Sequence, residues 1–131
     1  MPHITIEYSA NVAEHHDIDA LVDAVHAAAL ADGLPPLDGL RTRAAGRRHY
    51  RIADGHPGHA FVALTARIGP GRVAADKTRF LTAILDAAQT QVEARPSPLA
   101  IAWSAEVTEI NQAFRINRNG VRQRLAEMKE T

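Results

Sequence analysis

The sequence predicts an α+β fold in which two strand–helix–strand units join in one mixed sheet, with both helices on one face. Two observations support this prediction. Residues 3–8 and 99–107 alternate between apolar and more polar or smaller side chains, which is the periodicity of a strand with one buried face. Two longer segments, around residues 18–29 and 80–92, repeat their apolar residues every three to four positions, which indicates amphipathic helices.

The first unit begins with the strand at residues 3–8. The helix that follows is expected to start after Asp17, whose side chain can cap it, and to carry its apolar positions between Ile18 and Ala29. Gly33 is expected to end this helix, because the prolines at positions 35 and 36 cannot continue it.

Two short strands, at residues 39–44 and 49–53, are predicted to complete the first unit. The second unit begins with a strand at residues 60–68. It continues through a helix whose apolar face runs from Phe80 to Val92, and it closes with the strand at residues 99–107.

The chain is expected to form one domain, residues 1–131, with a C-terminal tail from about residue 111 that ends in a short helix from Val121. A hydrophobic content of 46% is enough for a core at this length. The strands at 60–68 and 99–107 are so apolar that the sheet face without helices is expected to be apolar too. Because large apolar faces usually associate, we expect a homo-oligomer.

The composition excludes several classes of protein. Lys+Arg and Asp+Glu both number 15, so no overall field attracts nucleic acid or an acidic membrane. There is no cysteine, which excludes disulfides, thiolate nucleophiles and cysteine–zinc sites. No segment reads as a signal peptide or a membrane span, and we expect a soluble cytoplasmic protein without a membrane partner.

Pro2 is the first candidate catalytic residue. An initiator methionine is usually removed before a small residue such as proline, and the Pro2 nitrogen then becomes a secondary amine. An ordinary α-amine has a pKa near ~8, and an apolar pocket beside cations lowers that pKa toward the range in which a base can move protons. The alternative is that Pro2 only begins a strand, where proline is tolerated.

Three arginines are candidate anion-binding residues. Arg41 and Arg43 occupy alternate positions of a predicted strand, so they point to the same face. Arg72 follows the turn Gly69-Pro70-Gly71 at the start of the second helix, where free backbone N–H groups favour an anion. A guanidinium suits a carboxylate, although each arginine is alternatively a solvated surface residue.

Two other interpretations are weaker. His49, His56 and His59 suggest a metal site, but the turn-forming residues around them follow no compact ligand motif, which favours ordinary loop histidines. The order of the elements also matches the RNA-recognition fold. Residues 58–64 lack the basic and aromatic residues of its sheet motif and keep only Phe61, so we expect no nucleic-acid partner.

Several blocks of sequence carry more information together than any one motif does. They are Pro2-His3-Ile4, Glu7-Tyr8-Ser9-Ala10-Asn11, Gly39-Leu40-Arg41-Thr42-Arg43, Ile52-Ala53-Asp54-Gly55, and Ala60-Phe61-Val62 through Arg67-Ile68-Gly69-Pro70-Gly71-Arg72. In their order and spacing these blocks resemble the 5-carboxymethyl-2-hydroxymuconate isomerase family of the tautomerase superfamily. The resemblance runs from residue 2 to about residue 110. It implies a homotrimer of tautomerase-like chains built from βαβ units and needing no cofactor.

The resemblance also implies an activity and its residues. By position, Pro2 matches the family's catalytic proline base, and Arg41 and Arg72 match arginines that bind substrate carboxylates. Arg43 fits its block with a less defined role in substrate binding. The implied reaction is keto–enol tautomerisation of 5-carboxymethyl-2-hydroxymuconate, or a similar hydroxymuconate-like polycarboxylate, in the breakdown of aromatic compounds.

The sequence departs from the family pattern at two places. Ala63 stands where family members often carry a histidine, and the tail around Asn117–Gly120 replaces adjacent asparagines followed by a histidine. The altered tail leaves the exact substrate open. Two alternatives therefore remain: a superfamily member that acts on a different oxo-acid or halo-acid, and a trimeric binding protein without catalysis.

Overall fold

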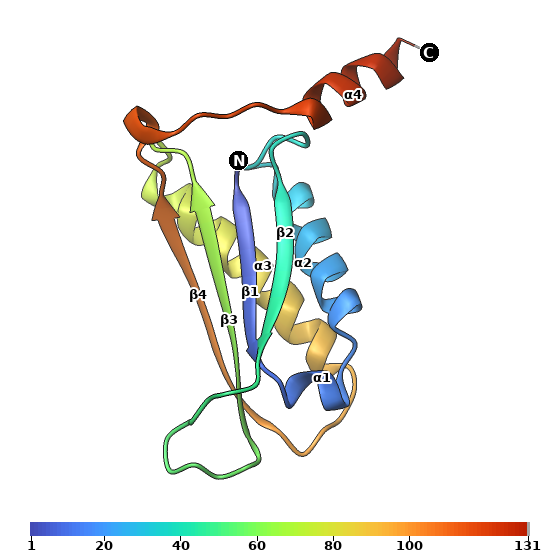
Figure 1. Cartoon of the computed structure of the whole chain (residues 1–131), viewed down its shortest axis with the longest axis vertical. Coiled ribbons are helices and arrows are strands. Elements are labelled where there is room, and N and C mark those ends of the chain that lie inside the picture. Colours follow the sequence, from blue (N-terminus) through green and yellow to red (C-terminus); the bar gives the residue numbers. More distant parts are fainter. Residues whose placement is uncertain (131) are drawn as a thin grey trace.

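A computed structural model describes residues 1–130 (Figure 1). Along the chain its elements are β1 (His3–Ser9), α1 (Val12–His15), α2 (Ile18–Asp32), β2 (Arg41–Arg47), β3 (His59–Ile68), α3 (Ala74–Glu93), β4 (Ala100–Glu109), the 3-10 turn η1 (Gln112–Phe114) and α4 (Gly120–Lys129). Among the described residues, no helix is both long and apolar enough to cross a membrane.

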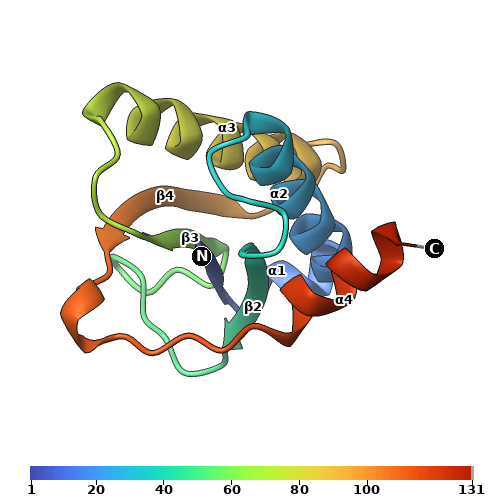
Figure 2. The ribbon, with the colours of Figure 1, turned by 90° about the horizontal axis from the view of Figure 1, so that it is seen from above.

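The four strands form one mixed sheet in the order β2-β1-β3-β4. The strands of each unit are parallel neighbours, β1 with β2 and β3 with β4, and the two units meet where β1 runs antiparallel to β3. Both long helices, α2 and α3, cover the same face of the sheet (Figure 2). The predicted α+β class and the two βαβ units are confirmed.

The first long helix begins and ends where the sequence predicts. The Asp17 side chain accepts a hydrogen bond from the backbone N–H of Ala20 at 3.1 Å, which caps α2. Gly33 follows the helix in the left-handed conformation, with φ of 83°, which glycine adopts without a steric penalty.

The prediction of two short strands at 39–44 and 49–53 is wrong. A single strand, β2, runs straight through Gly46, and residues 49–53 belong to the loop that follows. The reason is a close approach: a Cβ at position 46 would lie 2.9 Å from ring atoms of Tyr8 on the neighbouring strand. Gly46 therefore marks tight packing of β2 against β1 and not a turn.

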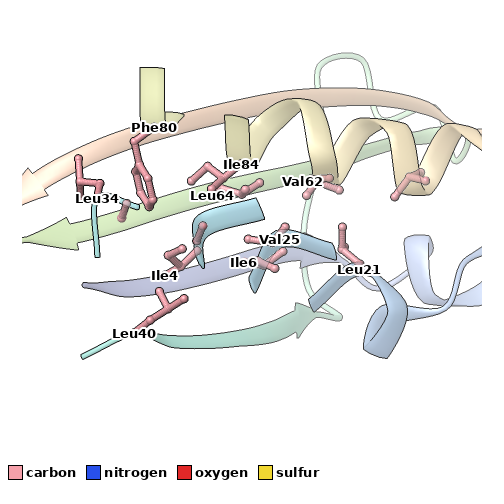
Figure 3. Close-up of a cluster of buried hydrophobic side chains, with 14 of the residues drawn as sticks. Ile4, Ile6, Leu21, Val25, Leu34, Leu40, Val62, Leu64, Phe80 and Ile84 are labelled. Atoms are coloured by element: carbon pink, nitrogen blue, oxygen red, sulfur yellow. The ribbon is translucent and has the colours of Figure 1, made fainter. Parts of the chain in front are cut away.

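The core lies between the sheet and the two helices (Figure 3). Ile4 and Ile6 of β1 are buried against Leu21 and Val25 of α2, and Ile84 of α3 joins the same cluster. Burial of one such side chain stabilises the folded state by about 1.5–3 kcal/mol. This layer therefore holds in place the strand ends that form the site described below.

The predicted apolar outer face of the sheet is wrong. Strand alternation turns the large apolar residues of β3 and β4 toward the helices, as Val62 and Trp103 illustrate. Apart from Phe61, whose ring contacts Tyr50, the face without helices, here called the outer face, carries polar or small side chains: His3, Thr5, Glu7, Arg41, Arg43, Ala45, His59, Ala63, Thr65, Arg67, Ala100, Ala102, Ser104, Glu106 and Thr108. The outer face is therefore not apolar enough to support the predicted association of chains through this surface.

The exposed apolar side chains lie mostly in the C-terminal part. The tail, residues 110–119, crosses the end of the sheet at which β1 begins, and α4 then projects from the body (Figure 1). Phe114 and Ile116 of the tail, and Val121 and Met128 of α4, are exposed. The short helix predicted from Val121 is thus confirmed, one residue longer at its start.

Candidate active site

A pocket of about 260 Å³ lies at the end of the sheet where β1 begins. Pro2 and Met1 lie on one side of it, next to the loop at residues 34–36 and the turn after β3 that carries Arg72. Another side is closed by Arg115 and Asn117 of the tail and by Arg122 of α4. Two residues far apart in the sequence, Pro2 and Arg72, are therefore brought to one pocket, and no acidic side chain among residues 1–130 lines it.

Pro2 is buried immediately before β1. Its carbonyl oxygen accepts a hydrogen bond from the backbone N–H of Arg41 at 3.1 Å, which extends the pairing of β1 with β2. Met1 packs so closely on Gly39 that a Cβ there would lie 2.5 Å from the Met1 nitrogen and oxygen. While Met1 is attached, the Pro2 nitrogen is a tertiary amide without basicity; removal of Met1 leaves a secondary amine in the pocket.

The electrostatic surroundings of this chain end disfavour a protonated amine. Burial lowers the pKa of the Met1 α-amine below its ordinary value, and the positive charges of Arg41 and Arg115 lower it further. Arg122 acts in the same direction, and the carboxylate of Asp38 opposes them. A Pro2 amine one residue further along the chain lies among the same charges.

Arg41 and Arg43 lie together on the outer face, as the alternation predicts, and flank the ring of His3. One guanidinium nitrogen of Arg41 is 3.4 Å from His3 Nε2, and one of Arg43 is 3.2 Å from His3 Nδ1. Desolvation, then Arg41 and Arg43, and in smaller part the chain amine and Arg67, lower the pKa of His3 to about 4. Neither arginine lines the pocket: Arg41 acts on the chain amine through its charge, and Arg43 lies farther along β2.

Arg72 is held at the pocket by the loop that follows α2. One of its guanidinium nitrogens donates a hydrogen bond to the carbonyl oxygen of Leu34 at 3.1 Å. Within residues 1–130 its side chain makes no ion pair, so the remaining N–H groups are available to an anion in the pocket. The helix α3 begins two residues after it, at Ala74.

Sequence reasoning connected the altered tail with the substrate but named none of the C-terminal residues as a site residue. Arg115, Asn117 and Arg122 line the pocket beside Pro2, but none of them was a candidate. The only signal was the departure of the tail from the family pattern, because arginines at irregular spacing in a loop have no periodicity that would place them.

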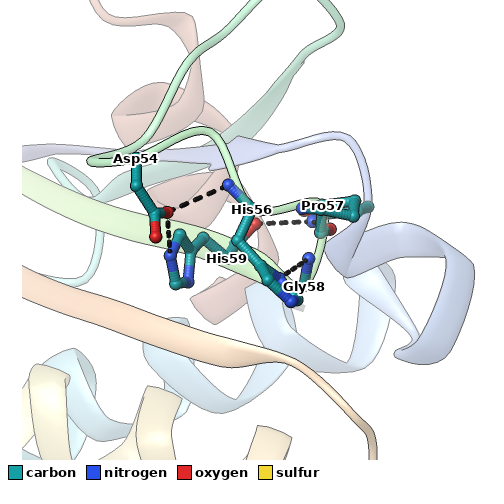
Figure 4. A network of polar contacts seen from close by, with 6 residues as sticks. Asp54, His56, Pro57, Gly58 and His59 are labelled. Atoms are coloured by element: carbon teal, nitrogen blue, oxygen red, sulfur yellow. Dashed lines mark hydrogen bonds and ion pairs between the residues drawn. The ribbon is translucent and has the colours of Figure 1, made fainter.

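The loop histidines organise a turn. Asp54 Oδ1 accepts a hydrogen bond from the backbone N–H of His56 at 3.1 Å and lies 2.8 Å from His59 Nε2 (Figure 4). His56 Nδ1 in turn accepts from the backbone N–H of Gly58 at 2.9 Å. These bonds shape the loop that leads into β3, and His49 is exposed elsewhere in it.

Comparison with known proteins identifies the family. The family model of 5-carboxymethyl-2-hydroxymuconate isomerases matches residues 2–125. A 5-carboxymethyl-2-hydroxymuconate Delta-isomerase from Escherichia coli is 29% identical over 121 residues, which cover 92% of this chain and 96% of that protein.

Two solved structures agree with this assignment. The crystal structure of a 5-carboxymethyl-2-hydroxymuconate isomerase from Deinococcus radiodurans R1 superposes with a TM-score of 0.84 at 30% identity, covering 95% of this chain and 93% of that one. That of a 5-carboxymethyl-2-hydroxymuconate delta-isomerase has the same TM-score and coverage at 24% identity and supports the fold. The match over nearly all of the sequence, together with the shared fold, shows that this chain belongs to the 5-carboxymethyl-2-hydroxymuconate isomerase family, a family of isomerases.

Proposed function

We propose that the chain catalyses the keto–enol tautomerisation of 5-carboxymethyl-2-hydroxymuconate, or of a similar hydroxymuconate-like polycarboxylate, with Pro2 as the general base. The observation that carries the proposal is the position of Pro2 in a pocket that is lined by arginines and, in the described part of the chain, by no acidic side chain. Family membership supports the reaction type, and the arginines favour a substrate with several carboxylates.

The proposed reaction moves one proton. The lone pair of the neutral Pro2 amine takes the enol O–H proton, which leaves a dienolate and a prolyl ammonium. The ammonium then returns the proton to a carbon of the conjugated chain as the carbonyl forms and one C=C bond shifts. Atoms and charge balance without a cofactor. General base catalysis of this kind contributes ~10²–10⁴-fold.

Arg72 and Arg41 are proposed to stabilise the charge that develops. Arg72 lines the pocket and could hold a carboxylate or a dienolate there, whereas Arg41 does not line the pocket and would act through the positive charge that it exerts on the chain amine. The same cations favour the neutral form of Pro2. Arg43 lies two residues further along β2 and is proposed to contribute only to the positive field.

Substitution of Arg72 tests this function. Arg72→Ala should lower kcat/KM for 5-carboxymethyl-2-hydroxymuconate by about 10²-fold, the effect of removing one charge-stabilising group. The exposed Arg48, which lies outside the pocket, provides the control Arg48→Ala. Ultraviolet absorbance follows the conversion, and thermal unfolding checks the fold. An unchanged rate in Arg72→Ala with intact folding would remove Arg72 from the site.

The chain is further proposed to be one domain that assembles as a homotrimer and to act in the cytoplasm. The exposed apolar side chains of the tail and α4 support an association. Because Arg115 and Asn117 of the altered tail line the pocket, an alternative substrate is a different oxo-acid with the same proline chemistry. Activity with that acid, and not with the hydroxymuconate, would favour the alternative.

A further inference from the structure

In the tail, the side chain of Arg115 lines the pocket, whereas the apolar side chains of its neighbours Phe114 and Ile116 are exposed. Arg115 has an extended backbone, with φ of −130° and ψ of 130°, so its side chain points away from those of its neighbours. Phe114 is 89% exposed and Ile116 is 85% exposed, whereas Arg115 is half-buried and lines the pocket beside Pro2. This is the reverse of the usual preference, which places apolar residues inside and arginine in water.

Arg115 has no counter-ion among the described residues. Within residues 1–130 its side chain makes neither an ion pair nor a hydrogen bond, although other arginines do: Arg47 pairs with Glu7 at 2.6 Å, and Arg79 pairs with Asp32 and Asp76. A partly buried guanidinium beside further cations costs free energy unless an anion joins it. The pocket therefore favours an anionic group next to Arg115.

Contacts with Asp38 fix the tail over the pocket. Asn119 Nδ2 donates a hydrogen bond to the carbonyl oxygen of Asp38 at 2.8 Å, and the Arg122 guanidinium pairs with the Asp38 carboxylate. Asn119 also caps α4, because its Oδ1 accepts from the backbone N–H groups of Val121 and Arg122. The carboxylate of Asp38 already engages Arg122 and is therefore not a counter-ion for Arg115.

We propose that Arg115 binds a carboxylate of the substrate that lies remote from the reacting enol, and that Asn119 is a positioning residue that holds the tail for this contact. The inference rests on the proposed use of this pocket as the substrate site. It assigns to the tail the selection of substrates with several carboxylates: Arg72 approaches from the turn after β3, and Arg115 approaches from the tail.

Two measurements on Arg115→Ala test the proposal. The first compares kcat/KM for 5-carboxymethyl-2-hydroxymuconate with that for phenylenolpyruvate, which has a single carboxylate. We expect a loss of roughly tenfold or more for the polycarboxylate and little change for phenylenolpyruvate. The second is calorimetric binding of propane-1,2,3-tricarboxylate, an unreactive probe, which should weaken by a similar factor.

The chain offers a matched control and a test of the positioning role. Arg118→Ala removes an exposed tail arginine that does not line the pocket and should leave both measurements unchanged. Arg115→Lys should restore part of the tricarboxylate binding, since the charge remains and the guanidinium fork is lost. Asn119→Ala should weaken binding in the wild-type background and have no further effect in Arg115→Ala. Circular dichroism confirms that each variant folds.

The outcomes separate this inference from the proposed function. If the protein is an active isomerase and Arg115→Ala matches the wild type in both measurements, the inference is overturned and the proposed function stands. If the wild type is inert toward both substrates but Arg115→Ala still weakens tricarboxylate binding, the isomerase proposal fails and the carboxylate site stands. Equal losses in Arg118→Ala and Arg115→Ala would also overturn the inference, because they would show a general effect of charge.

Discussion

The residues at the start of the chain lie in a positive field that acts on two titratable groups. The α-amine of Met1 and the ring of His3 are both partly buried near Arg41, and the protonated form of each is disfavoured. The cause is the same for both, desolvation together with nearby guanidinium groups. A base that must be neutral to act therefore has a favourable position at this end of β1.

The pKa of His3 makes stability depend on pH. Because this pKa is about 4 in the folded protein and ~6.5 in an unfolded chain, the unfolded state binds more protons between these values. The contribution of His3 to the free energy of unfolding should be fully present above pH ~6.5 and should be lost progressively as the pH falls to about 4. His3→Gln should flatten this part of the profile, measured by urea unfolding at several pH values.

The exposed His49 provides the control for this profile, since His49→Gln should keep the slope of the wild type. Equal slopes in His3→Gln and the wild type would show that the arginines around His3 do not set its protonation. Arg41, Arg43 and Arg67 are the cations that face this ring from β2 and β3.

Some residues of the site were predictable and others were not. Pro2 stood out because its nitrogen has chemistry only at a chain start, and Arg72 stood out because it follows a glycine turn. The shared face of Arg41 and Arg43 followed from strand alternation, which is a local rule. Arg115 was missed because its position depends on how the tail folds back onto Asp38, a contact that no local pattern encodes.

At the scale of elements, segments with a clear hydrophobic period were predicted well. Positions at which two neighbouring strands pack unusually closely were not. The helix from Ile18 to Asp32 has both a cap and a glycine stop in its sequence. The strand β2 was misread because Gly46 looks like a turn residue in isolation, whereas the ring of Tyr8 across the strand pair explains it. The polarity of the outer face was misjudged because the summed hydrophobicity of β3 and β4 hides their alternation.

The loop between α2 and β2 yields a prediction at Gly39. In the Met1-free chain, the atoms that crowd a Cβ at position 39 are gone, so Gly39→Ala should fold and be stabilised by at most about 0.4–1 kcal/mol. Its methyl group would occupy the space beside the Pro2 nitrogen, and kcat/KM should fall. Steady-state kinetics and thermal unfolding measure the two effects.

Gly120→Ala is the matched control, because nothing lies within 4 Å of a Cβ at that position and the residue begins α4. An unchanged kcat/KM in Gly39→Ala would contradict the account, since it would show that the space released by Met1 is not used by the substrate.

At the scale of the whole molecule, the proposed trimer should give a solution mass about three times the 14.2 kDa of one chain. The exposed apolar residues of the tail are its expected contacts, because they have no cover within residues 1–130. Phe114→Ser combined with Ile116→Ser should shift the mass toward that of the single chain, measured by light scattering after size exclusion. A wild-type protein that is monomeric at all concentrations would contradict the proposed assembly.

The most direct test of the central claim is the specific activity of samples that retain Met1 to different extents, with the retained fraction measured by intact mass. Because an acylated Pro2 nitrogen has no basicity, we expect the rate of tautomerisation to rise in proportion to the Met1-free fraction and to extrapolate to the uncatalysed rate at full retention. A chain that keeps Met1 and is as active as the Met1-free chain would contradict the role of Pro2 as the base.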